Sequence, residues 1–140
     1  MKYLGHNYRL QVESAVPSTY NTIKGEQTLG IQRGANNIDT SDKGQFPYGS
    51  SRGGSRNISI SFGCIPDLPD ANGYDRLKTV ANDSDGTPFN VRIINVADSD
   101  NVVFECSVTV SDRNNTLDQG AAASATCTFV NADAPVTDDL

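Results

Sequence analysis

The sequence predicts a mainly β fold: an antiparallel β-sandwich or half-barrel with one flanking α-helix and a long inter-strand loop. Apolar and polar residues alternate in several short stretches, which is typical of strands with one buried and one solvated face. Only one stretch has apolar residues at helical spacing, and it lies between two groups of strands. A run rich in Gly, Ser and charge, 38–56, separates two of the strands.

The stretches before the helix are predicted from alternation and turn residues. Residues 8–13 alternate strictly, with Tyr8, Leu10 and Val12 on the inward face. A Pro-Ser-Thr break follows, and a second strand region covers 20–33, where glycines indicate bends or bulges. Residues 57–64 (NISISFGC) alternate again. These three stretches make up the first group of strands.

The helix and the later strands follow from spacing. Asp70 is a suitable N-cap, and residues 71–81 place apolar side chains on one helical face. Residues 89–96 and 102–110 read as a hairpin with a short polar connection, and 121–131 as the last strand. We expect a single domain over residues 1–131 and a polar C-terminal arm over 132–140.

The run 38–56 (IDTSDKGQFPYGSSRGGSR) is the sequence's most unusual feature. Loops of this length are uncommon in compact domains and are usually functional or disordered. Its second half contains a Gly/Ser/Arg cluster, 49–56, but it lacks the Gly-Lys-Ser/Thr ending of a phosphate-binding loop. It also precedes a strand, so no helix N-terminus is available to bind an anion. The loop therefore indicates assembly rather than chemistry.

No catalytic, cofactor or metal site is expected, and the protein is not expected to be an enzyme. His6 is the only histidine, which excludes a histidine-based triad and a multi-histidine metal site. The carboxylate clusters do not complete a calcium-loop spacing and are explained by turns and helix capping. A structural cation near Asp98 and Asp100 is left open.

Charge and cysteine usage bound the remaining classes. The net charge is −6, so a surface that grips nucleic acid is not expected. The three cysteines, Cys64, Cys106 and Cys127, lack CxxC spacing and are expected to be buried, reduced thiols. No signal-peptide pattern and no membrane-spanning apolar run is visible, so we expect synthesis in a reducing cytoplasm.

The order of these parts resembles a phage tail tube protein (major tail protein). The resemblance covers nearly the whole chain. It rests on the strand 8–13, the Gly-punctuated region 25–31, the segment IDTSD at 38–42, the strand SRNISISFGC at 55–64 and the following Asp-Leu-Pro-Asp at 67–70. No recurring counterpart is evident for the acidic segment 132–140.

The resemblance implies a subunit that assembles as hexameric rings, which stack into a hollow tube around a DNA-conducting lumen. Six copies would carry about −36 per ring, which would repel DNA phosphates and leave the DNA mobile. Candidate lumen-facing residues come from polar strand positions: Gln11, Glu13 and Ser59. The sequence does not decide which sheet face lines the lumen.

The loop 38–56 would connect one ring to the next. Its candidate inter-subunit residues are Phe46, Pro47, Tyr48, Arg52 and Arg56, with the two arginines expected to meet carboxylates of the neighbouring ring. Alternatively, Phe46 and Tyr48 fold back onto their own sandwich.

The implied partners are further copies of the chain and other tail proteins: the tape measure, the tail terminator, the distal tail or baseplate protein and, in a contractile tail, the sheath. DNA would pass through during ejection without specific binding, and no membrane partner is expected. The implied location is the virion tail, after synthesis in the bacterial host cytoplasm. The alternatives are an extracellular β-sandwich adhesion or carbohydrate-binding module and, more remotely, a small carboxylate hydrolase.

Overall fold

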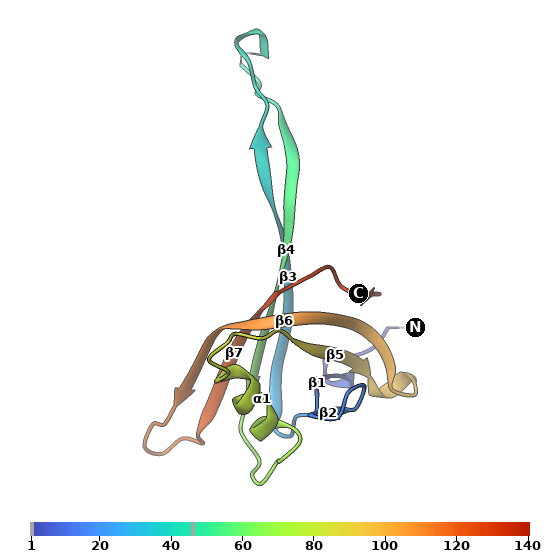
Figure 1. Cartoon of the computed structure of the whole chain (residues 1–140), viewed down its shortest axis with the longest axis vertical. Coiled ribbons are helices and arrows are strands. Elements are labelled where there is room, and N and C mark those ends of the chain that lie inside the picture. Colours follow the sequence, from blue (N-terminus) through green and yellow to red (C-terminus); the bar gives the residue numbers. More distant parts are fainter. Residues whose placement is uncertain (1, 46) are drawn as a thin grey trace.

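The computed structural model describes residues 2–45 and 47–140, and its strands form one antiparallel eight-stranded sheet (Figure 1). The strand order is β2-β1-β5-β6-β7-β4-β3, and β8 pairs with β6 beside that path. The strands are β1 (Tyr8–Glu13), β2 (Tyr20–Thr22), β3 (Glu26–Asp39), β4 (Ser51–Cys64), β5 (Phe89–Asn95), β6 (Asn101–Thr116), β7 (Ser124–Asn131) and β8 (Thr137–Asp138). The helix α1 covers Tyr74–Ala81, and the 3-10 turns are η1 (Gly5–Asn7), η2 (Lys43–Gln45) and η3 (Val96–Asp98).

Strand β6 joins the two halves of the sheet. Its first half pairs with β5, as in Ile93↔Phe104, and its second half pairs with β7, as in Val110↔Phe129. A register shift between Val110 and Asp112 marks a bulge, which bends a strand and increases its twist. The sheet folds over on itself but does not close, which confirms the predicted sandwich or half-barrel.

The core lies between these two halves and is built from the alternating residues of the strands. Leu10, Ile60, Phe104 and Phe129 are fully buried in one cluster that also includes α1 residues. The three cysteines are free and buried, as expected. Burial raises the pKa values of the Cys64 and Cys127 thiols to about 11, so both stay protonated and unreactive at neutral pH.

The helix is present but begins at Tyr74, later than predicted, and Gly73 occupies the N-cap position. The prediction that Asp70 is the N-cap residue is therefore wrong, because the helix begins four residues after it. The Asp70 carboxylate nonetheless accepts hydrogen bonds from the backbone N–H groups of Tyr74 (3.1 Å) and Lys24 (3.0 Å). A Cβ at Gly73 would collide with this carboxylate, so the close approach requires glycine there. Asp70 thus joins the start of α1 to the β2–β3 connection.

The predicted loop 38–56 is shorter than expected, because both of its ends, 38–39 and 51–56, are strand. Strands β3 and β4 stay paired as far as Asp39↔Ser51, so the connection covers only residues 40–50. The outer part of this hairpin extends well away from the rest of the molecule (Figure 1). Local hydrogen bonds order its end: Asp39 and Asp42 accept from the N–H groups of Ser41 and Gly44, both at 2.8 Å.

Three later segments also differ from the prediction. Strand β6 continues to Thr116, beyond the predicted end at residue 110, and β7 begins at Ser124 rather than at 121. The segment 132–140, expected as a polar arm, contains β8 and pairs with β6. Among the described residues, no helix is long and apolar enough to cross a membrane.

Candidate assembly surfaces

The β3–β4 hairpin carries the predicted inter-subunit residues that the structure describes, with Pro47 and Tyr48 in the 40–50 connection and Arg56 near the root, opposite Ala35. Tyr48 is 85% exposed and Ile38, on the same hairpin, is 57% exposed. Pro47, Arg52 and Arg56 are exposed as well. Tyr48 therefore does not fold back onto its own sandwich. Phe46 lies outside the described residues.

The hairpin carries two exposed arginines, Arg52 and Arg56. Within residues 2–45 and 47–140, neither Arg52 nor Arg56 forms an ion pair. A two-stranded ribbon without a third strand or a packed face is only marginally stable in water. Tyr48 and Ile38 are the large apolar side chains that the described part of this ribbon exposes.

A hydroxyl-rich face without positive charge covers the outward side of β3, β4, β7 and the second half of β6. Ladder pairing aligns its residues in three rows: Gln32, Ser59, Val130 and Thr109; Gly30, Ser61, Thr128 and Asp112; Thr28, Gly63, Thr126 and Asn114. These rows contain no lysine or arginine, and Asp112 is their only charged member. We call this surface the hydroxyl face. It includes Ser59, one of the predicted lumen-facing residues.

Gln11 and Glu13 lie on a different surface from Ser59. The Gln11 side chain donates to Thr22 Oγ1 (3.1 Å), and Glu13 Oε2 accepts from Asn90 Nδ2 (3.2 Å) on the outward side of β1 and β5. The inward sides of β1 and β4 share one core, so their outward sides point away from each other. The structure therefore does not bring the three predicted lumen residues together.

The surface around Gln11 and Glu13 is charged and tightly paired, unlike the hydroxyl face. The Arg92 guanidinium lies 3.8 Å from the centre of the Tyr20 ring and 3.3 Å from Glu105 Oε1. The Tyr20 hydroxyl donates to the same Glu105 oxygen at 3.1 Å. Burial, reinforced by hydrogen bonds to Glu13 and Glu105, raises the pKa of Tyr20 well above its usual value. The Arg92, Tyr20 and Glu105 side chains of this face thus contact one another within the chain, although the Arg92 Nε itself forms no hydrogen bond among the described residues.

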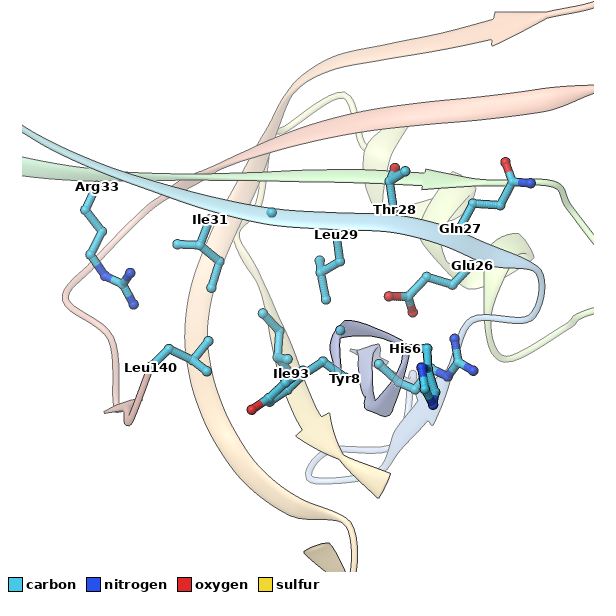
Figure 2. Close-up of a pocket in the computed structure, with 13 residues that line it drawn as sticks. His6, Tyr8, Glu26, Gln27, Thr28, Leu29, Ile31, Arg33, Ile93 and Leu140 are labelled. Carbon is cyan, nitrogen blue, oxygen red and sulfur yellow. The ribbon is translucent and has the colours of Figure 1, made fainter. Parts of the chain in front are cut away.

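Strand β3 ends the sheet order, pairing with β4 alone, and a groove of about 760 Å³ lies beside it. Figure 2 shows Leu29 and Ile31 pointing from β3 toward Ile93 and Leu140. At one end of the groove, Glu26 accepts a hydrogen bond from the N–H of Leu10 (2.9 Å), linking β3 to β1. Burial raises the pKa of the Glu26 carboxyl. A long edge strand beside an apolar groove can accept another chain.

Neither Glu26 nor the buried role of Asp70 was predicted from the sequence. Glu26 lies inside the predicted strand region 20–33, where a carboxylate at a strand start is unremarkable. From the sequence, Asp70 is recognisable only as a candidate helix cap. In both cases the role depends on a hydrogen-bond partner that lies far away in the sequence, and the spacing of residues along the chain does not reveal such a partner.

The acidic turn at Asp98 and Asp100 connects β5 and β6. Ser99 and Asp100 have left-handed backbone conformations (φ 53° and 57°), as expected for a tight connection. In the described part of the chain, no group of three or more His, Cys, Asp or Glu side chains is arranged to hold a metal ion. His6 lies in the short turn η1.

Comparison with known proteins gives matches in structure and none in sequence. No protein-family model and no curated protein sequence matches the chain. A protein of the tail of an empty gene transfer agent particle, a tail with C6 symmetry, superposes with a TM-score of 0.79 at 17% identity, covering 97% of this chain and 98% of that one. The SPP1 tail tube protein gives a TM-score of 0.74 at 13% identity, covering 99% and 82%.

A third similar structure comes from the baseplate of the anti-feeding prophage. Its TM-score is 0.68 at 12% identity, with 100% of this chain and 99% of that chain covered. At such identities the likeness establishes the fold, and the matches span nearly the full length of the chain. The expected resemblance is confirmed at that level: this chain has the fold of the tail tube proteins.

Proposed function

We propose that this chain is the structural subunit of a phage tail tube, which self-assembles as hexameric rings stacked around a DNA-conducting lumen. The observation that carries the proposal is the long hairpin, which extends away from the rest of the molecule and exposes Tyr48 and Ile38 among the described residues. The tail tube fold and the C6 symmetry of a similar tail support it. The protein would reside in the virion tail and contact the other tail proteins at the ends of the tube.

Rings would form by joining sheets from neighbouring subunits. Strand β3 is a 14-residue strand at the end of the sheet order, and unpaired edges of this length favour pairing with another chain. Strand β2, at the other end, is only three residues long. Head-to-tail contacts of this kind close into a ring when the rotation between subunits permits it.

Rings would stack through the hairpin. Tyr48 and Pro47 would bury against the next ring, Arg52 and Arg56 would meet its carboxylates, and Phe46 is assigned to the same contact. The outer ribbon would then gain the third surface that a two-stranded hairpin needs for stability. A heterologous contact repeated along an axis produces a filament, as a tube requires.

The hydroxyl face is the proposed lumen surface. Its three rows carry no positive charge, so DNA phosphates would find no cation whose counterion release could hold them. Ser and Thr hydroxyls keep such a surface hydrated. The proposal therefore places Ser59 at the lumen and Gln11 and Glu13 outside it. DNA would slide past without specific contacts.

Negative-stain microscopy of the purified protein tests the proposal. Hollow rings and tubes are expected; a protein that stays a monodisperse monomer at high concentration overturns it. A hairpin-shortened variant serves as the matched comparison: residues 35–56 are replaced by Asn-Gly, because Gly34 and Asn57 face each other in the ladder. This variant should fold normally and form no tubes.

A further inference from the structure

The C-terminal segment, residues 132–140, continues β7 along the edge of β6. After the last β7 pair, Val108↔Asn131, the N–H groups of Ala132, Val136 and Asp139 donate to the carbonyls of Ser107, Glu105 and Val103, each at 2.8 Å. Between them, β8 pairs Thr137 with Glu105. The segment is therefore held along β6 by backbone hydrogen bonds on both sides of its bend at 132–136.

The end of this segment reaches from β6 to β3. Asp138 forms a two-pronged ion pair with Arg33, with distances of 2.5 Å and 3.1 Å to the guanidinium nitrogens. Leu140 lies in the groove beside Ile31 (Figure 2). Strands β6 and β3 are not neighbours in the sheet. The segment thus bridges strands from the two halves.

The bridge lies at the root of the hairpin. The β4–β7 ladder ends at Ser59↔Val130, and the next N–H, that of Ile58, donates to the Asn131 side chain (2.8 Å). Ile58 faces Arg33 across the hairpin. Beyond this pair the ribbon leaves the body, starting with Gly34 and a bulge at Ala35–Asn37. Arg33–Asp138 therefore supports the ribbon immediately before a glycine and a bulge.

We propose that the C-terminal segment is a strut that fixes the direction in which the hairpin leaves the body, with Arg33 and Asp138 as its positioning residues. Residues 34–39 alone extend about 20 Å beyond the root. A tilt of about 10° at the root would displace their far end by about 3 Å, enough to misalign side chains at a packed interface. The strut's use in stacking rests on the proposed tube function; the intramolecular positioning does not.

Distances between spin labels on monomers test the positioning directly. Labels at Tyr48→Cys and Asp118→Cys report the tip and the body, because the native cysteines are buried and unreactive. Asp138→Ala, and removal of residues 136–140, should broaden the tip-to-body distance distribution. Asp139→Ala is the matched control: its side chain forms no ion pair among the described residues, so the distribution should not change.

The double variant Arg33→Asp with Asp138→Arg rebuilds the ion pair with its charges exchanged, so it should restore the narrow distance distribution. If the two side chains mattered only for local packing, the exchange would not restore it. In unlabelled protein, Asp138→Ala should lower the rate of tube elongation roughly threefold, a fold-change that corresponds to the free energy of one surface ion pair.

An unchanged distribution in Asp138→Ala overturns the assignment of Arg33 and Asp138. Unchanged distributions in both Asp138→Ala and the truncated protein overturn the strut. If the truncated protein does not fold, Asp138→Ala and the exchanged pair still decide the question. If wild-type protein forms no tubes while Asp138→Ala broadens the distribution, the tube function fails and the strut stands.

Discussion

Replacing Tyr48 with alanine separates the proposed ring contact from the stability of the subunit. Tyr48 is 85% exposed in the single chain, so its removal should leave the free energy of unfolding almost unchanged. If the side chain is buried between rings, the loss per added subunit is about 2 kcal/mol. A loss of that size corresponds to a roughly 30-fold higher critical concentration for assembly.

Sedimentation of tubes at graded protein concentrations measures the critical concentration, and thermal unfolding of the monomer measures stability. Leu117→Ala is the matched control, because Leu117 is 78% exposed but lies in the β6–β7 connection, away from the hairpin. It should change neither quantity. An unchanged critical concentration for Tyr48→Ala, or an equal rise for both variants, would refute the assignment of Tyr48 to the ring contact.

Three further predictions follow from the described contacts. Asp70→Ala leaves two N–H groups without their acceptor and should lower the free energy of unfolding by about 3 kcal/mol in urea titrations. The control Asp75→Ala breaks only an exposed ion pair with Lys78 and should lower it by less than about 0.5 kcal/mol. Burial raises the Glu26 pKa, which means that the charged carboxylate destabilises the fold, so Glu26→Gln should raise the melting temperature at pH 7. The gain should vanish as the pH falls below the ordinary range of a carboxyl pKa, because Glu26 is then neutral in the folded and the unfolded state. A gain in melting temperature that persists at low pH contradicts the reasoning. In assembled tubes, Ser61→Cys should be protected from a bulky maleimide while Gln11→Cys reacts; the reverse pattern would exclude the hydroxyl face as the lumen.

The sequence sufficed for the fold class because most strands bury one face in their own core. Leu10 and Val12, or Ile60 and Phe62, alternate with polar residues, and all four are buried as the alternation predicts. The helix was found for the same reason, since Tyr74 and Leu77 pack against that core. Its first residue was misplaced because Gly73, which has no capping side chain, precedes it.

The sequence could not show which outward faces belong together. Gln11, Glu13 and Ser59 occupy equivalent polar positions on their strands, and alternation treats them alike. Their separation depends on how β6 bends over the core at the bulge between Val110 and Asp112. No glycine or proline at that point of the sequence indicates the bulge. The bridging roles of Arg33 and Asp138 depend on the same bend, because they lie in distant parts of the chain.

The outer hairpin escaped prediction for a different reason, which bears on its function. Its residues from Ala35 to Asp39 are exposed on both faces. Neither face needs apolar residues, so the sequence shows no alternation that would predict a strand. A strand with no buried face in its own chain gains little from folding alone. On the proposed function, its stabilising partner is another copy. Two 14-residue strands whose outer parts have the sequence of a loop are then what an inter-subunit element should produce, because the packing constraints on those parts lie in the assembled tube.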